Sequence, residues 1–253
     1  MKKIINWKTF IILSITCAIT TMLVIPYQAA LIPELVEDGV MFYILAFVQG
    51  LIMFSVVTFI GLFLAPKVGF GLLVLSGGES KWQRLKVVIM PSILFGVLSG
   101  VLIVLGEYLV FQAIFTVPIS LSDTHVPIWT AFLASFYGGI AEEVLLRLFV
   151  MTLFVWLISK FKKNVEGLPT NWSIWLAMIL ASILFGLGHL PATSEMTDIT
   201  VAVVARAVVL NGIGGIVFGW LFWKKGLVSA IIAHFSADIV LHIITPIVIR
   251  TIT

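Results

Sequence analysis

The sequence has few charged residues and a single cysteine. Only 11% of its 253 residues are charged, 61% are hydrophobic, and the mean hydropathy is +1.19. Soluble domains carry roughly 25% charged residues. The composition therefore excludes an ordinary soluble globular protein and is typical of a polytopic helical membrane protein. The one cysteine, Cys17, excludes an intrachain disulfide.

Long apolar runs recur along the whole chain, and a helix needs roughly 20 apolar residues to cross a bilayer. The runs cover residues 8–31, 40–65, 87–117, 127–159, 171–190, 198–223 and 226–249. They predict an all-α, polytopic transmembrane helical bundle of about seven spans, with the basic N-terminal segment retained as the first span. Because no repeat and no low-complexity linker divides the sequence, we expect one membrane-embedded domain over residues 1–253.

Basic and acidic residues alternate from one loop to the next. The basic loops and ends contain Lys2, Lys3, Lys8, Lys67, Lys81, Arg84, Lys86, Lys160, Lys162, Lys163, Lys224 and Lys225. The intervening loops contain Glu34, Glu37, Asp38, Asp123, Glu195 and Asp198. Because cytoplasmic loops of membrane proteins are enriched in Lys and Arg, this pattern predicts the N-terminus inside and the C-terminus outside.

Few ionisable side chains fall within or at the ends of the spans. Each costs at least a few kcal/mol in lipid, so each is expected to face protein or water and to have a purpose. They are Glu107, Glu142, Glu143, Arg147, His189, Arg206, His234, Asp238 and His242. For Glu107 and Arg206 we favour an ion pair between the third and sixth spans, whereas His242 has no partner at helical spacing.

Residues 138–149 read GGIAEEVLLRLF, which places two glutamates and an arginine in an apolar run. Glu143 and Arg147 are four residues apart, so on a helix they share a face and can form an ion pair. Glu142 is five residues from Arg147 and is left without a local partner, so it is free to act as a general acid or base. The small residues just before it allow another helix or an extended peptide to approach closely.

Two later spans carry polar residues at the same spacing. His189 follows Phe185 by four residues in FGLGHLP, and Asp238 follows His234 by four in HFSAD. Each pair has a structural alternative, since a histidine at a helix end is often interfacial and a His–Asp pair can link two helices. The functional prediction depends on the conjunction of a free carboxylate, an imidazole and a His–Asp pair on three spans.

The order E-E-x-x-x-R, F-x-x-x-H and H-x-x-x-N/D resembles the CAAX protease and bacteriocin-processing family, also called the Abi family. This family includes the type II CAAX prenyl endopeptidases and many bacterial relatives. The resemblance covers Glu142 to Asp238, within a predicted catalytic core of about residues 127–250. Asp238 occupies the position where prenyl-endopeptidase members typically carry Asn.

The resemblance implies a role for each motif residue. Glu142 would be the general base that activates a water, and His189 would orient or polarise that water. His234 and Asp238 would stabilise the oxyanion or help to bind a metal. Glu143 and Arg147 would support the helix, as their spacing also predicts.

The identity of a cofactor is left open by the sequence. A divalent metal such as zinc could be held by Glu142, His189, His234 and Asp238. The paired-ligand motif H-E-x-x-H is absent, and a metal-free mechanism with Glu142 as base is the alternative. The expected partners are a peptide or protein substrate and the lipid bilayer, with no nucleic acid.

The main functional prediction is an intramembrane endopeptidase that cuts a short or membrane-tethered peptide, in a multi-pass protein of the bacterial cell membrane. One alternative is a proton-coupled transporter that uses Glu142 and His189 as a relay. The sequence shows no inverted repeat of spans, which counts against that alternative. A second alternative is a non-enzymatic immunity or regulatory protein on the same scaffold.

Overall fold

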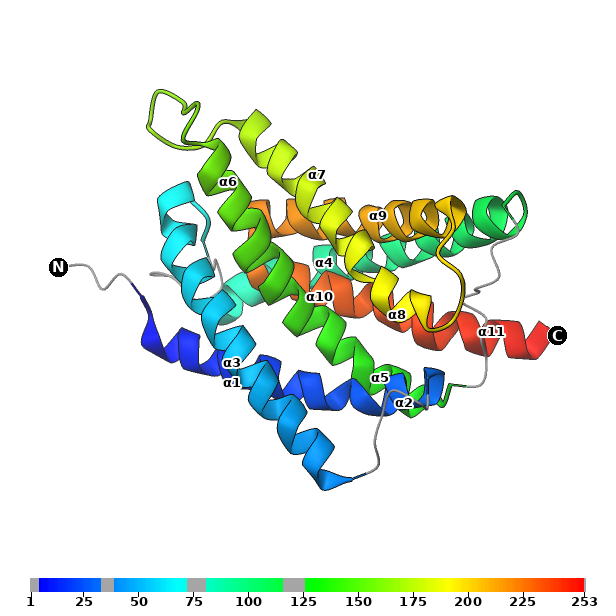
Figure 1. Ribbon diagram of the computed structural model, residues 1–253. Helices are drawn as coiled ribbons and strands as arrows, with labels where there is room; N and C mark the ends of the chain where they lie inside the picture. The colour runs from blue at the N-terminus through cyan, green and yellow to red at the C-terminus, as the bar shows by residue number, and fades with distance from the viewer. Residues whose placement is uncertain (1–4, 33–38, 72–80, 116–125, 253) are drawn as a thin grey trace.

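The computed structural model describes residues 5–32, 39–71, 81–115 and 126–252, and within these ranges the chain is helical with no β-strand (Figure 1). This confirms the all-α prediction. The helical elements are α1 (Trp7–Leu23), α2 (Ile25–Leu31), α3 (Val40–Leu64), η2 (Ala65–Val68), α4 (Lys81–Gly106), η3 (Glu107–Gln112), α5 (Ile128–Phe136), η4 (Tyr137–Glu142), η5 (Val144–Met151), α6 (Thr152–Ile158), α7 (Asn171–Gly188), α8 (Leu190–Ser194), α9 (Val201–Lys225), α10 (Leu227–Ile239), η6 (Val240–Ile244) and α11 (Thr245–Ile252).

All of the predicted spans appear as helical segments of a polytopic membrane bundle. Among the described residues, six of these segments are long and apolar enough to cross a membrane. The remaining one runs as continuous helix through α5, η4, η5 and α6, and it differs from the others because it carries Glu142, Glu143 and Arg147. In Figure 1, α1 begins and α11 ends at opposite ends of the bundle.

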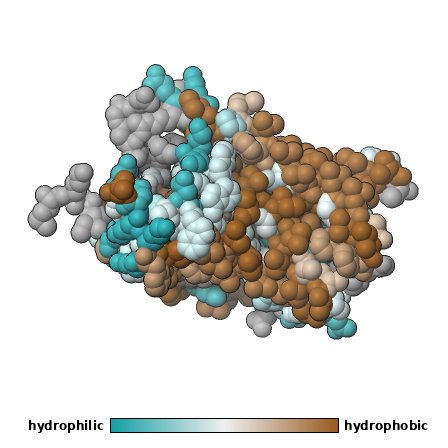
Figure 2. Space-filling model, turned by 90° about the horizontal axis from the view of Figure 1, so that it is seen from above, coloured by the Kyte–Doolittle hydropathy of each residue, from teal (hydrophilic) through white to brown (hydrophobic). Residues whose placement is uncertain are grey.

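The direction of insertion stays a prediction. Hydrophilic residues gather at the end of the molecule that carries the N-terminus, whereas apolar residues cover most of the face shown in Figure 2. Several of the loop charges on which the predicted orientation depends lie outside the described residues, namely Lys2, Lys3, Glu34, Glu37, Asp38 and Asp123.

Polar side chains begin several of the helices. The side chains of Asn6, Thr170 and Thr200 each accept a hydrogen bond from a backbone N–H in the first turn of α1, α7 and α9 respectively. These bonds satisfy donors that the helix itself leaves without a partner. Gly226 separates α9 from α10 with φ of 85°, a left-handed conformation that glycine adopts without a steric penalty.

Small residues allow α7 and α9 to pack closely. A Cβ atom at Gly215 would lie 2.5 Å from Ser182 Oγ, and one at Gly219 would lie 2.8 Å from Met178 Cγ. The two glycines are four residues apart, so they form one flat surface on α9. Larger side chains at either position would push the two helices apart.

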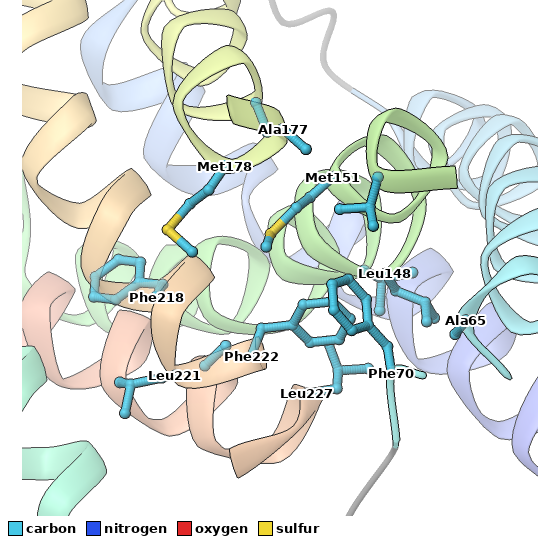
Figure 3. Packing of buried hydrophobic residues seen from close by; sticks show 14 of the residues in the cluster. Ala65, Phe70, Leu148, Met151, Ala177, Met178, Phe218, Leu221, Phe222 and Leu227 are labelled. Atoms are coloured by element: carbon cyan, nitrogen blue, oxygen red, sulfur yellow. The ribbon is translucent and has the colours of Figure 1, made fainter. Parts of the chain in front are cut away.

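The apolar core lies against this contact and beside the polar motif residues. Met151 of η5, Met178 of α7 and Phe218 and Phe222 of α9 belong to the cluster drawn in Figure 3, and each is at most 2% exposed. The core therefore joins the helix of the E-E-x-x-x-R motif to the helices that follow it.

The predicted ion pair between Glu107 and Arg206 is confirmed. Arg206 Nε lies 2.7 Å from Glu107 Oε2, and Glu107 is fully buried. Gln112 Nε2 also donates to Glu107 Oε1 at 2.9 Å. The pair links η3 to α9 and partly neutralises a carboxylate that burial alone would make costly.

In the part of the chain that the structure describes, four π-helical segments interrupt the spans, and the sequence analysis did not predict them. The segments η4 and η5 flank Glu143, and η6 begins two residues after Asp238. Threonine hydroxyls satisfy carbonyls that the altered pattern affects: Thr152 donates to Arg147 O and Thr245 to Val240 O, each over five residues. Segments of this kind are often found at functional sites, because they re-aim side chains.

Candidate active site

The first part of the site is the ion pair predicted from helical spacing. Arg147 Nε lies 3.3 Å from Glu143 Oε2, and the two side chains are 1% and 0% exposed. None of the three guanidinium nitrogens makes a hydrogen bond to a residue that the structure describes, and neither does Glu143 Oε2, so the pair is an ion pair only. The guanidinium instead lies 5.4 Å from the ring centroid of Phe185 and 5.9 Å from that of Phe218. Glu143 and two aromatic faces therefore stabilise this buried charge.

His234 of α10 joins this pair through the second oxygen of the same carboxylate. Its Nδ1 lies 2.8 Å from Glu143 Oε1. A carboxylate only accepts hydrogen bonds, so Nδ1 carries the proton. Glu143 thus bridges a guanidinium and an imidazole, with an ion pair at Oε2 and a hydrogen bond at Oε1. The sequence analysis missed this contact, because the two residues are 91 positions apart and no local pattern connects them.

The other nitrogen of His234 faces the two remaining carboxylates. Its Nε2 lies 3.8 Å from Glu142 Oε2 and 3.6 Å from Asp238 Oδ1, separations longer than a direct hydrogen bond. The side chains of Glu142 and Asp238 are 21% and 11% exposed. Glu142 is therefore the accessible member of the adjacent glutamates, in agreement with the spacing argument that left it without a partner on its own helix.

Two phenylalanines hold the imidazole in place. The ring of Phe218 stacks on His234 with centroids 4.8 Å apart and an interplanar angle of 25°, and Phe185 meets the same ring edge-on at 5.7 Å. Phe185 also contacts the His189 ring, at 4.9 Å. The phenylalanine of the F-x-x-x-H motif therefore lies between the two histidines.

His189 is the capping residue at the C-terminal end of α7. Its Nδ1 lies 2.8 Å from the carbonyl oxygen of Phe185. Because a carbonyl oxygen only accepts, Nδ1 carries the proton, and the neutral ring then presents a lone pair at Nε2. The structure thus places His189 at the site through Phe185 rather than through a direct contact with a carboxylate.

The small residues that precede the glutamates make room for a helix. A Cβ atom at Gly138 would collide with the Asp238 carboxylate and would lie 3.3 Å from His234 Nε2, and one at Gly139 would lie 3.0 Å from Phe235 Cβ. Of the two occupants that the sequence left open, helix or peptide, the structure places helix α10 against these glycines. This close approach brings the His–Asp pair to the glutamates.

The predicted metal ligands do not form a metal-binding group in this arrangement. Each imidazole hydrogen-bonds through Nδ1, His234 with Glu143 and His189 with Phe185, which leaves Nε2 as the nitrogen that could bind a metal. Within residues 5–32, 39–71, 81–115 and 126–252, however, no three His, Cys, Asp or Glu side chains are grouped so as to hold a metal ion. As they are arranged, the four side chains therefore do not form the zinc site of that alternative.

Comparison with known proteins identifies the part of the chain that carries this site. Residues 124–240, a little under half of the chain, match the family described as type II CAAX prenyl endopeptidase Rce1-like. This domain belongs to the CAAX protease family. No curated protein and no solved structure matches the chain. The CAAX protease domain contains every residue of the three motifs, from Glu142 to Asp238.

One polar pair beside the CAAX protease domain was not predicted. The hydroxyl of Tyr27, on α2, lies 3.3 Å from Nδ1 of His242, on η6. The sequence analysis assigned His242 no partner at helical spacing, although Asp238 lies four residues before it. No sequence pattern pointed to Tyr27.

Proposed function

We propose that this protein is an intramembrane endopeptidase that hydrolyses a short or membrane-tethered peptide with water activated by Glu142. The observation that carries the proposal is the division between two adjacent glutamates. Glu143 is buried and committed to Arg147 and His234, whereas Glu142 is partly exposed and has only a 3.8 Å contact with His234. A partly exposed carboxylate that no direct hydrogen bond occupies is the one suited to take a proton from water.

In the proposed reaction, Glu142 removes one proton from water and the resulting hydroxide adds to the scissile carbonyl carbon. His189 keeps its Nδ1 proton on the Phe185 carbonyl, so its Nε2 can accept the second O–H of the water and orient it. The carbonyl oxygen becomes negative, and a donor at His234 Nε2 stabilises it. Glu142 then passes its proton to the leaving nitrogen as the C–N bond breaks, which yields an acid and an amine.

Glu143 and Asp238 act on His234 in this scheme. Glu143 accepts the Nδ1 proton, so it fixes the ring orientation and favours the imidazolium form that donates from Nε2. Asp238 is itself an anion, and an anion is a poor neighbour for an oxyanion. We therefore assign Asp238 to holding the His234 ring, through its 3.6 Å contact with Nε2. The family resemblance alone gave Asp238 a share in oxyanion stabilisation.

The test is cleavage by the purified full chain in detergent. The panel contains a farnesylated CAAX-type peptide, its unprenylated counterpart and unmodified peptides, with products identified by mass spectrometry. Glu142→Gln is expected to lower turnover by about 10²–10⁴-fold. Glu166→Gln, a matched change in an exposed loop, is expected to leave turnover unchanged.

Two results would contradict the proposal. The first is a Glu142→Gln variant that cleaves as fast as the wild type. The second is proton-coupled transport in sealed vesicles by a protein that cleaves no peptide in the panel, which would support the transporter alternative. The two CAAX peptides also separate the substrate classes, because only a prenyl endopeptidase requires the farnesyl group.

A further inference from the structure

Tyr27 and His242 form a polar pair between the first and last helical spans. The Tyr27 hydroxyl lies 3.3 Å from His242 Nδ1, and the two rings meet edge-on with centroids 5.7 Å apart. Both side chains are half-buried. Both residues also lie outside residues 124–240, so the family match assigns them no role.

The pair extends the row of polar side chains that begins at the candidate active site. His234, Asp238 and His242 follow one another at four-residue spacing along α10 and η6. His242 therefore lies about one helical turn beyond Asp238. Its contact with Tyr27 brings the first span to this end of the row.

Exposure separates the site into a closed part and an accessible part. Glu143, Arg147 and His234 are at most 6% exposed, so a substrate has little access to their side chains. Asp238 is also buried, at 8% exposed, whereas Glu142 and the Tyr27–His242 pair are of intermediate exposure. A peptide that reaches Glu142 therefore meets the site on its accessible side, where polar groups next to Asp238 are available to it.

A peptide must be extended for its amide bond to be attacked. Inside a membrane an extended backbone lacks water as a partner, and each unsatisfied amide N–H or C=O costs several kcal/mol. The protein must therefore supply donors and acceptors beyond those of the reacting groups. A phenol hydroxyl and an imidazole each offer both kinds of group, and one bond between them leaves capacity for a ligand.

We propose that Tyr27 and His242 form a substrate subsite, which hydrogen-bonds the peptide backbone beside the scissile bond on the Asp238 side. This inference rests on the proposed peptidase function. It assigns the first span a part in substrate recognition, although that span lies outside the family match.

The experiment uses the full chain and the peptide of the panel that the wild type cleaves best. Tyr27→Phe and His242→Gln are each expected to raise KM about three- to tenfold, the loss of roughly one hydrogen bond, with kcat within about twofold. The double variant should raise KM by less than the product of the single effects, because the two residues act as one unit. Tyr108→Phe is the matched control, since the Tyr108 hydroxyl is buried without a hydrogen-bond partner among the described residues.

A binding measurement separates recognition from chemistry. On the Glu142→Gln background, the labelled peptide should bind Tyr27→Phe more weakly by the same factor as the rise in KM. Cleavage by the wild type with KM unchanged in Tyr27→Phe would overturn the inference and leave the proposed function intact. A fall in kcat alone would also overturn it. A wild type that cleaves no peptide would overturn the proposed function, and the inference with it. Tyr27→Phe keeps the aromatic ring, so its result is decisive even if His242→Gln folds poorly.

Discussion

Replacing Glu143 by Gln tests whether this carboxylate holds the buried charge of Arg147. In the structure the two side chains are 0% and 1% exposed and 3.3 Å apart. Glutamine keeps an oxygen that can accept the Nδ1 proton of His234, so the substitution mainly removes the negative charge. A buried ion pair that loses one partner leaves an uncompensated charge, which costs about 3–5 kcal/mol.

The free energy of unfolding is measured by titrating the purified protein in mixed micelles with SDS. The chain has eight tryptophans, so their fluorescence can report the transition. Glu143→Gln is expected to lower the free energy of unfolding by about 3–5 kcal/mol. Glu142→Gln removes a partly exposed carboxylate and Glu166→Gln an exposed one, so both should stay within about 0.5–1 kcal/mol of the wild type.

A double variant tests the same ion-pair argument by removing the second charge as well. In Glu143→Gln combined with Arg147→Met, no charge is left buried, so most of the lost stability should return. A Glu143→Gln variant as stable as the wild type would refute the ion-pair argument. So would a double variant that is no more stable than Glu143→Gln alone.

Three further predictions follow from the packing, the donor set and the loop charges. Gly138→Ala should destabilise the protein by about 1–3 kcal/mol and lower turnover, because its Cβ collides with a carboxylate of α10. Gly212→Ala has nothing within 4 Å and should be neutral in both assays; equal effects of the two substitutions would refute the packing argument. A strong chelator should leave peptide cleavage unchanged, and activity lost to the chelator and restored by zinc would contradict this. On a Cys17→Ala background in intact cells, an impermeant maleimide should label Glu195→Cys and not Lys162→Cys; the reverse pattern would refute the predicted orientation.

The sequence determined the features that depend on spacing along one helix. Apolar runs of spanning length predicted the helical segments, and four-residue spacing predicted the contact between Glu143 and Arg147. The same spacing left Glu142 without a partner on its own helix. The ion pair between Glu107 and Arg206 was also predicted, because two opposite charges in apolar spans have few other ways to be neutralised.

Only the tertiary structure decided which helix faces meet. The contact of Glu143 with His234 joins residues 91 positions apart, and that of Tyr27 with His242 joins residues 215 positions apart. Periodicity shows which residues share a face, but it contains nothing about the neighbouring helix. Here the neighbour is set by close packing at glycines such as Gly138, which brings α10 against the glutamates. Spacing along one helix was enough to pair Glu143 with Arg147. Its second partner, His234, could be found only from the packed bundle.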